Sequence, residues 1–183
     1  MSESDQTGSF TPPLSAALLA RMIRVDHAGE YGAVRIYAGQ QLVLGRGPKG
    51  PLLRHMAEQE RGHLAAFSDL LSRRRVRPSA LLPLWNLAGF ALGAVSAALG
   101  ERVAMACTVA VEEAIDAHYA AQETALVDTD PEASALIVHC RAEELEHRDI
   151  GRANEAERAP AYDLLVAAIK SGCRVAIALS ERL

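Results

Sequence analysis

The chain has 183 residues, with 19 Lys and Arg against 23 Asp and Glu and a formal net charge of -4. A surface that binds nucleic acid needs clustered positive charge to meet phosphates, so this composition argues against a nucleic-acid partner. The length suits one domain with a core of its own. Half of the residues are apolar but only 4% are aromatic. Ala, Leu, Val and Ile therefore supply most of the apolar mass, which favours an all-α fold.

The first thirteen residues, MSESDQTGSFTPP, are polar and partly acidic. They lack the basic and then apolar order of a secretory signal and the Arg-rich pattern of an organelle-import peptide. We expect residues 1–13 to form a flexible tail and residues 14–183 to form a single helical domain.

The eight prolines divide the chain into long windows that favour helix. We expect six helices, at residues 14–44, 51–74, 80–98, 101–128, 131–157 and 160–181. No stretch alternates with period two for long enough to indicate a strand. The connection at 45–50 has the glycine spacing of a dinucleotide-binding loop, but without a preceding strand a helix–helix turn is heavily favoured.

The three cysteines, Cys107, Cys140 and Cys173, have no C-x-x-C spacing. An odd number without such spacing indicates neither a disulfide framework nor a zinc knuckle. We expect them to be small buried hydrophobic side chains in a reducing compartment.

The chain contains the pattern Glu-x-x-His twice, and each copy follows a predicted helix that carries a candidate single carboxylate. The six residues are Glu30, Glu60, His63, Glu112, Glu144 and His147. A spacing of three places the carboxylate and the imidazole on one helix face. A lone pair of this kind is usually a solvated helix face, but the doubled pattern is that of inward-facing ligands in ferritin-like di-iron bundles. It favours a two-metal centre over surface ion pairs.

Charge and ligand chemistry indicate which metal this centre would hold. Four carboxylates balance two divalent cations, and neutral imidazoles add no further charge. Oxygen ligands with one nitrogen per metal suit iron or manganese better than structural zinc. We expect two iron ions, with open positions that dioxygen can reach.

Neighbouring acids complicate the choice of ligands; they are Glu58, Glu113, Glu143 and Glu146. Glu146 is the direct neighbour of His147 and points away from its face, whereas Glu143 remains an alternative. Helical periodicity barely separates Glu112 from Glu113, so either could be the ligand of that helix.

Other polar residues have two interpretations each. Asp26 and His27 lie about one turn before the first candidate ligand, where they could orient it or form an ordinary polar turn. His118 and Tyr119 lie close to two turns after Glu112. The tyrosine could donate a hydrogen bond to a ligand or substrate, but packing in the core is slightly favoured.

Residues 81–100 form a stretch of 20 residues without a charge, and Arg73-Arg-Arg-Val-Arg77 precedes it. Its length just reaches that of a transmembrane helix. A single crossing would place the two halves of the metal site on opposite sides of the bilayer. We therefore expect an apolar helix that packs on the bundle and dips into one leaflet, with the arginines facing anionic headgroups. The alternative is a fully buried helix of the core.

Several longer stretches resemble the demethoxyubiquinone hydroxylase family of ubiquinone biosynthesis, and the resemblance runs from about Leu18 to Leu183. They are Arg24-Val-Asp-His-Ala-Gly-Glu-Tyr-Gly-Ala33, Pro83-Leu-Trp-Asn-Leu-Ala-Gly-Phe-Ala-Leu-Gly93, Ala104-Met-Ala-Cys-Thr-Val-Ala-Val-Glu-Glu113 and Gly172-Cys-Arg-Val-Ala-Ile177. The resemblance implies a ferritin-like four-helix bundle with two additional helices, one of them apolar and membrane-associating, so that residues 14–183 would be a ferritin-like di-iron domain. It implies the same six ligands, with Glu112 rather than Glu113.

The resemblance also implies the reaction: a di-iron monooxygenase that hydroxylates a demethoxyubiquinone, a polyprenyl benzoquinol, at ring carbon C6. Dioxygen and reducing equivalents from NADH would be consumed. The implied partners are the quinone substrate, a membrane surface and a lipid-binding protein of a quinone-biosynthesis complex. Together with the N-terminal residues, it favours a peripheral protein on the cytoplasmic face of a bacterial inner membrane.

Two other functions fit part of the pattern. A ferritin-type ferroxidase or iron-binding protein would use the same centre but gains nothing from a membrane-seeking helix. A non-enzymatic helical scaffold on a membrane would use the Glu-x-x-His pairs as surface ion pairs and bind no iron.

Overall fold

A computed structural model describes residues 14–183, and the expected tail at residues 1–13 lies outside this range. Six α-helices and one short 3-10 helix make up the described chain, in which no strand occurs. They are α1 (Ala16–Leu44), α2 (Gly50–Arg74), α3 (Leu82–Ala98), α4 (Glu101–Leu126), α5 (Pro131–Ala153), η1 (Ala156–Arg158) and α6 (Tyr162–Ser180). The all-α prediction is confirmed, and most predicted helix ends lie within two residues of the observed ones.

Local signals explain where the helices begin and end. The side chain of Ser15 accepts a hydrogen bond from the Leu18 amide, and that of Asp130 accepts one from the Ala133 amide. The predicted end of α5 at residue 157 is wrong. The Asn154 side chain donates to the Ile150 carbonyl at 2.8 Å, and Glu155 adopts a left-handed φ of 64°. A residue in that conformation cannot continue the helix, so α5 stops at Ala153.

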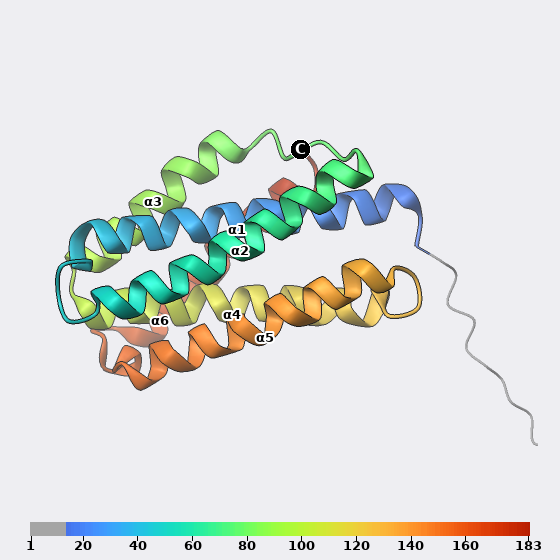
Figure 1. The fold of residues 1–183 in the computed structure, drawn as a ribbon. Coiled ribbons are helices and arrows are strands. Elements are labelled where there is room, and N and C mark those ends of the chain that lie inside the picture. The colour runs from blue at the N-terminus through green and yellow to red at the C-terminus, as the bar shows by residue number, and fades with distance from the viewer. Residues whose placement is uncertain (1–13) are drawn as a thin grey trace, which may run out of the picture.

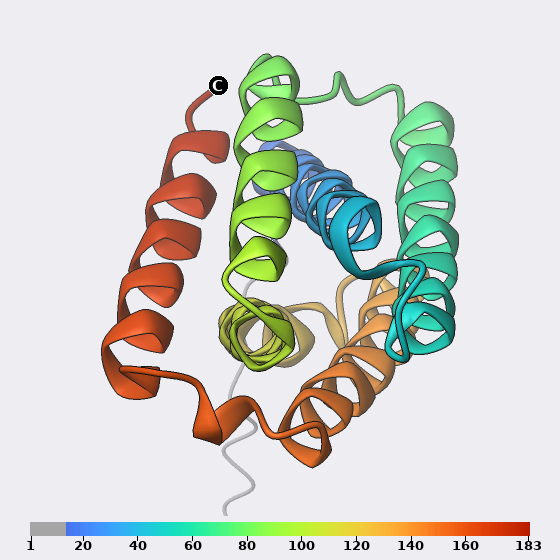
Figure 2. The same ribbon diagram turned by 90° about the vertical axis from the view of Figure 1, so that its left-hand side faces the viewer.

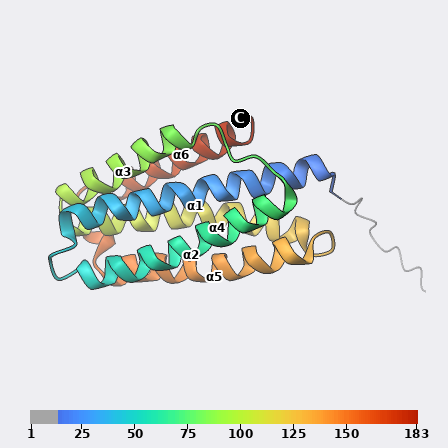
Figure 3. The same cartoon turned by 45° about the horizontal axis from the view of Figure 1, so that its top comes forward.

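Four helices, α1, α2, α4 and α5, run alongside one another as a bundle (Figure 1). The helices α3 and α6 cover one side of this bundle, where α3 packs on α1 and α6 on α4 (Figures 2 and 3). This is the expected arrangement of four central helices with two additional ones. Its assignment to the ferritin-like folds stays a prediction.

The apolar core is divided along the bundle axis. Of three clusters, one contains Leu53 and Met56 of α2 and another contains Phe67 and Leu70 of the same helix; the third lies among α1, α4 and α6. The stretch of α2 between the first two carries Glu60 and His63, so two dry clusters enclose a polar middle section. Burial of the apolar clusters provides the main drive for folding, and it holds the polar section away from water.

Helix α3 approaches α1 so closely that only glycine fits at the contact. A Cβ atom on Gly93 would lie 1.9 Å from the Ile36 carbonyl oxygen, and one on Gly39 would lie 2.3 Å from that of Phe90. This contact buries the glycine side of α3 and leaves several apolar side chains outside: Leu84 is 49% exposed, Leu87 70% and Val95 58%, as is Leu99 just after the helix, at 69%. The alternative of a fully buried core helix is therefore wrong.

The four arginines before α3 are exposed, and two of them form ion pairs with carboxylates. Arg73 pairs with Asp69 and Glu132, and Arg74 pairs with Asp130 and Glu132. Carboxylates at the end of α2 and around the start of α5 therefore neutralise part of this positive charge. That the four arginines face anionic headgroups stays a prediction. Within residues 14–183, no helix is both long and apolar enough to cross a membrane.

The α1–α3 contact predicts a sharp difference between glycine substitutions. Gly93→Ala should lower the free energy of unfolding by about 1–3 kcal/mol, because the new methyl group must push two backbones apart. Gly172→Ala is the control: within the described chain, a Cβ there meets nothing within 4 Å. Gly172→Ala should raise the free energy of unfolding by about 0.5–1 kcal/mol, because alanine has less conformational freedom to lose on folding than glycine. Urea denaturation measures both, and equal effects would contradict the close contact.

Candidate metal centre

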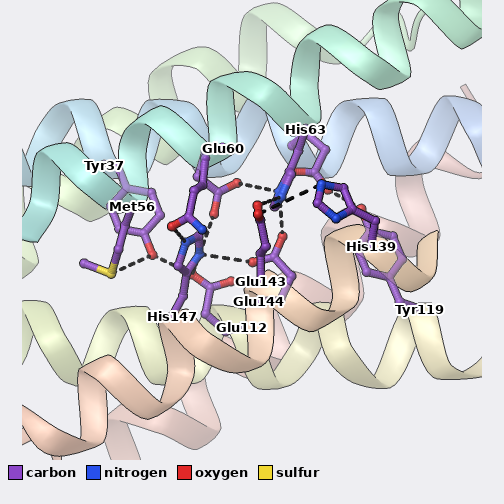
Figure 4. Close-up of polar contacts among 12 residues, drawn as sticks. Tyr37, Met56, Glu60, His63, Glu112, Tyr119, His139, Glu143, Glu144 and His147 are labelled. Atoms are coloured by element: carbon purple, nitrogen blue, oxygen red, sulfur yellow. Dashed lines mark hydrogen bonds and ion pairs between the residues drawn. The ribbon is translucent and has the colours of Figure 1, made fainter. Parts of the chain in front are cut away.

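The six predicted ligands gather in the polar middle of the bundle, and each of the four central helices contributes. Figure 4 shows five of them, from α2, α4 and α5, pointing toward one another. None of the six is more than 3% exposed: Glu30 1%, Glu60 0%, His63 3%, Glu112 1%, Glu144 0% and His147 0%. The helical spacing that led to their selection does place them on inward faces.

Their donor atoms form two overlapping groups, each compact enough for one ion. One group joins Glu30 and His63 with Glu60 and Glu144, and the other joins Glu112 and His147 with the same two shared glutamates. Within each group the donor atoms lie within 4.8 Å of one another. Sequence reasoning had assigned Glu60 to one half-site and Glu144 to the other. In the structure both carboxylates lie between the two positions.

The distances around the two imidazoles repeat across the centre. The Nδ1 atom of His63 lies 3.2 Å from Glu144 Oε1 and 3.4 Å from Glu30 Oε2. The Nδ1 atom of His147 lies 3.1 Å from Glu60 Oε1 and 3.4 Å from Glu144 Oε2. Each ring therefore turns the same nitrogen toward carboxylate oxygens, at least one of which belongs to another helix.

These inward atoms lack protein partners, which tests whether cations fit. Both oxygens of Glu60, both of Glu144 and the Nδ1 atoms of both histidines have no hydrogen-bond partner among residues 14–183. Unpaired buried carboxylates are costly, so native proteins pair them or let them coordinate metals. Oxygen and imidazole donors in this number suit iron or manganese. The residues present fit a two-metal centre.

The titration behaviour without metal agrees with this interpretation. Burial, and then the negative charges of Glu144 and Glu30, raise the pKa of Glu60 well above its ordinary value. Burial, followed by the charges of Glu144 and Glu60, does the same to Glu112. In the metal-free protein, protons bound to these carboxyl groups therefore neutralise part of the negative charge of the cluster.

The outer nitrogen of each ligand histidine is also held. The Nε2 atom of His63 donates to Glu143 Oε2 at 2.7 Å, and that of His147 donates to Gln59 Oε1 at 3.0 Å. Both partners offer an acceptor oxygen here, so the proton belongs on Nε2 and the Nδ1 lone pair faces the centre. Glu143 is thus placed behind His63 and outside the group of inward donors.

Two buried tyrosines reach across the bundle to the remaining glutamates. Tyr37 donates to Glu112 Oε1 at 2.7 Å, and Tyr119 donates to Glu30 Oε1. Burial, and then the nearby carboxylates, raise the pKa of both phenols well above the ordinary value, so both stay protonated donors. The favoured interpretation of Tyr119 as a packing residue alone is wrong, although its ring does stack on Phe67.

The other neighbouring acids lie outside the centre. Glu113 pairs with Arg152 and Lys170, both at 2.7 Å, so of the two neighbours it is Glu112 that faces the cluster. Glu58 pairs with Arg61 on the surface, and Glu146 is exposed. Both face away from the cluster, as helical phase predicts.

The polar residues before Glu30 make no hydrogen bond to the six candidate ligands within the described chain. His27 Nε2 lies 3.2 Å from Ser68 Oγ. Asp26 accepts from His118 at 3.0 Å and from Gln122 at 2.7 Å. The suggestion that Asp26 and His27 directly orient a ligand is therefore wrong, and His118 serves to pair Asp26.

The cysteines are not bridged to one another in the described structure, as expected. Cys107 and Cys140 are buried, whereas Cys173 is half-buried. The sulfur of Cys140 lies close to donor atoms of Glu30 and His63. Burial raises the pKa of this thiol strongly, so it stays neutral beside the carboxylates.

Two cavities adjoin the centre from different sides. An apolar cavity of about 460 Å³ lies among α1, α3, α4 and α6; its wall includes Gly29 and Val111, the neighbours of Glu30 and Glu112 along the chain. A polar groove of about 350 Å³ lies between α2 and α5 and is lined by His63 and Glu143, among others. The centre is therefore bordered by apolar surface on one side and polar surface on the other.

Sequence reasoning missed Tyr37 and Gln59. Tyr37 follows Glu30 by seven residues, as Tyr119 follows Glu112, and Gln59 precedes Glu60 as Glu143 precedes Glu144. A comparison of the two halves at equal distances from their ligands would have found both residues.

The buried acids predict how the stability of metal-free protein depends on pH. The pKa values of Glu30, Glu60 and Glu112 are raised, so above the ordinary value of 4.5 the folded state binds more protons than the unfolded one. The free energy of unfolding should then fall as pH rises from about 5 toward about 8. The raised pKa of His63 acts in the same direction above 6.5. Urea denaturation after chelation measures this slope.

A divalent cation should remove that loss, because it binds the deprotonated ligands of the folded state alone. At free metal near 100 times the dissociation constant, the expected gain is about 2.7 kcal/mol. Glu112→Gln should abolish most of the gain and stabilise the metal-free protein near neutral pH. Its neighbour provides the control Glu113→Gln, which should keep the gain. An unchanged gain in Glu112→Gln would contradict the assignment.

The chain also matches known proteins over nearly its whole length. It is 57% identical to "NADPH-dependent 3-demethoxyubiquinone 3-hydroxylase, mitochondrial" of Homo sapiens, over 97% of this chain and 83% of that protein. It is 57% identical to "3-demethoxyubiquinol 3-hydroxylase" of Rhodospirillum rubrum (93% and 81%) and 42% identical to "5-demethoxyubiquinone hydroxylase, mitochondrial" of Saccharomyces cerevisiae (92% and 79%). Residues 17–180 match the family described as ubiquinone biosynthesis protein COQ7. With most of its length covered by that match, the chain belongs to the COQ7 family of ubiquinone biosynthesis proteins.

Proposed function

We propose that this chain is a di-iron monooxygenase that hydroxylates a demethoxyubiquinol in ubiquinone biosynthesis. The observation that carries the proposal is a set of six buried donors with unpartnered inward atoms, in a bundle that has an apolar cavity on one side. The names of the relatives agree with the reaction. The reacting carbon is the ring position that lacks its methoxy group, C6 in the numbering of the implied reaction.

The ligands Glu30, Glu60, His63, Glu112, Glu144 and His147 would hold two iron ions, which supply reversible two-electron redox chemistry and open positions for dioxygen. The protein orients those ligands, and bound cations would keep their carboxylates deprotonated despite the raised pKa values of Glu30, Glu60 and Glu112. Tyr37 and Tyr119 hold one oxygen each of Glu112 and Glu30, leaving the other oxygen of each carboxylate facing inward. Hydrogen bonds of this kind fix ligand orientation and tune metal affinity.

The apolar cavity is the proposed site of the quinol ring and the start of its polyprenyl chain. Its walls are almost entirely aliphatic and glycine surface, which suits a benzoquinol with methyl and prenyl substituents. Its lining residues Gly29 and Val111 directly precede Glu30 and Glu112 in the chain, so we propose that a ring bound there can reach the centre. Such a pocket also excludes water, which protects reactive intermediates.

Hydroxylation consumes one dioxygen, two electrons and two protons; one oxygen atom enters the substrate C–H bond and the other leaves as water. The glycine-rich connection at 45–50 lies between α1 and α2, and no strand precedes it in the described chain. It therefore lacks the setting of a dinucleotide-binding loop. We propose that NADH reduces the bound quinone, and that the resulting quinol passes the electrons on. The name of the human relative gives NADPH, so both donors belong in the test.

The exposed side of α3 is the proposed membrane-docking surface. Its side chains Leu84, Leu87, Val95 and Leu99 are exposed, while other residues of α3 line the cavity. Leu164 and Val175 of the neighbouring α6 are also exposed, at 73% and 59%. A lipid-dissolved substrate could enter between these two helices without crossing water. A lipid-binding partner protein of a quinone-biosynthesis complex, and a location on the cytoplasmic face of a bacterial inner membrane, remain part of the proposal.

Isotope labelling tests the reaction. Protein reconstituted anaerobically with ferrous iron should convert a demethoxyubiquinone, in the presence of NADH or NADPH and ¹⁸O₂, to a product with one labelled oxygen by mass spectrometry. Glu144→Gln, which removes a carboxylate between both positions, should lower turnover by at least about 100-fold. Iron oxidation without product from a fully loaded protein would favour a ferroxidase instead. Absence of bound iron would favour a scaffold.

Vesicle co-sedimentation tests the docking surface. Leu87→Asp should weaken binding to anionic vesicles about tenfold or more, because a buried leucine contributes about 1.5–3 kcal/mol. Val138→Asp is the matched control on α5, where the valine is 46% exposed on another side of the bundle. Both variants should keep their metal content. Equal vesicle binding by the two variants would rule out α3 as the docking surface.

A further inference from the structure

The centre is built twice, and the two halves share the same pattern of supporting residues. In one half, Glu30 accepts from Tyr119 and His63 donates to Glu143; in the other, Glu112 accepts from Tyr37 and His147 donates to Gln59. Each support comes from the opposite half of the chain. Glu143, directly before Glu144, holds His63 of the first half of the chain. Gln59, directly before Glu60, holds His147 of the second half.

Among these four supporting hydrogen bonds, the chemical symmetry is broken in the pair behind the histidines. The acceptor behind His63 is the carboxylate of Glu143, at 2.7 Å, and the acceptor behind His147 is the amide oxygen of Gln59, at 3.0 Å. Glutamate and glutamine have the same shape, so the two positions differ mainly in charge. The four inward carboxylates already balance two divalent cations, and Glu143 adds a fifth negative charge. Its hydrogen bond goes to His63, while Gln59 and the exposed His139 lie on its other side.

We propose that this difference makes the two metal positions unequal: the position of Glu30 and His63 binds a divalent cation more tightly than that of Glu112 and His147, and Glu143 is the residue responsible. The inference rests on the proposed metal centre. It adds an order in which the two positions fill and an electronic difference between the two ions. The six ligands alone would predict neither, because the two positions have ligands of the same types.

The physical cause is the hydrogen bond from the imidazole. A carboxylate that accepts the outer proton of a metal-bound histidine makes the inner nitrogen a stronger donor, and the loss of such a partner typically costs 10–100-fold in metal affinity. A charge-assisted hydrogen bond is also stronger than one to a neutral amide. Glu143 is half-buried beside the polar groove, so solvent only partly screens its charge.

Three variants separate this charge from all other features of the centre. Glu143→Gln makes both acceptors amides, Gln59→Glu makes both carboxylates, and the double exchange moves the charge to the other histidine. All keep an acceptor oxygen at each position and nearly the same side-chain volume. Glu58→Gln is the control, because it removes a negative charge one residue away from Gln59. In the described chain, Glu58 forms an ion pair with the exposed Arg61 on the surface.

The measurement is isothermal titration calorimetry with ferrous iron alone, under anaerobic conditions. The wild type and Glu58→Gln should bind two ions in steps about 10–100-fold apart in affinity. In Glu143→Gln the tighter step should weaken toward the other, and in Gln59→Glu the weaker step should strengthen. Mössbauer spectra of wild-type protein with one equivalent of ⁵⁷Fe should show one dominant quadrupole doublet. Anomalous diffraction from crystals of protein with one equivalent of iron should place that ion beside His63 in the wild type. In the double exchange the ion should lie beside His147.

Each outcome bears on a different statement. Protein that binds no iron would overturn the metal centre itself, and with it the proposed function. Two ions of equal affinity in the wild type would overturn only the inequality, and unequal ions that are unaffected by Glu143→Gln would overturn the role of Glu143. If one variant failed to fold, the other single variant and the wild-type spectra would still decide the matter.

Discussion

The burial of four carboxylates at one point is the constraint on which the rest of this structure depends. Glu30, Glu60, Glu112 and Glu144 are at most 1% exposed, and several of their oxygens find no protein donor among residues 14–183. Such a cluster repels itself unless cations or protons neutralise it. The apolar clusters on either side keep the four central helices together despite this repulsion. The fold therefore holds a site that is unfavourable by itself and becomes favourable when positive charge is bound.

The division of labour among the helices follows from that constraint. The helices α1, α2, α4 and α5 each use an inward face for ligands, which leaves little inward surface for a substrate. The helices α3 and α6 supply it from outside, by enclosing the apolar cavity against α1 and α4. The glycine contact between α1 and α3 matters here, because a closer approach of the backbones directs the larger side chains of α3 toward the cavity and the surface. A helix that looked like a membrane span in the sequence thus has two distinct faces.

Much of this could be predicted from the sequence because local rules govern it. Proline positions located the helices, and the spacing of Glu60 and His63 followed from the helical repeat. What could not be predicted depends on contacts between helices. Periodicity could not separate Glu112 from Glu113, but the cations of α5 and α6 that pair with Glu113 do. Likewise, Tyr119 looked like a core residue because its partner, Glu30, lies on another helix. The end of α5 was missed because a single side-chain cap, at Asn154, outweighs a helix-compatible sequence after it.

The two cavities give the centre a direction that its internal symmetry lacks. The apolar cavity lies on the side of α1 and α4 that faces α3 and α6, and its lining includes the chain neighbours of Glu30 and Glu112. The polar groove lies between α2 and α5, and its lining includes His63. A lipid substrate and the polar reactants of a hydroxylation have opposite solvation needs, since the ring must be kept dry while protons and water must be exchanged. Access from opposite sides satisfies both needs without a moving gate. It also explains why Glu143 can keep its charge: it stands on the wet side, where partial solvation stabilises a carboxylate that the dry side could not hold.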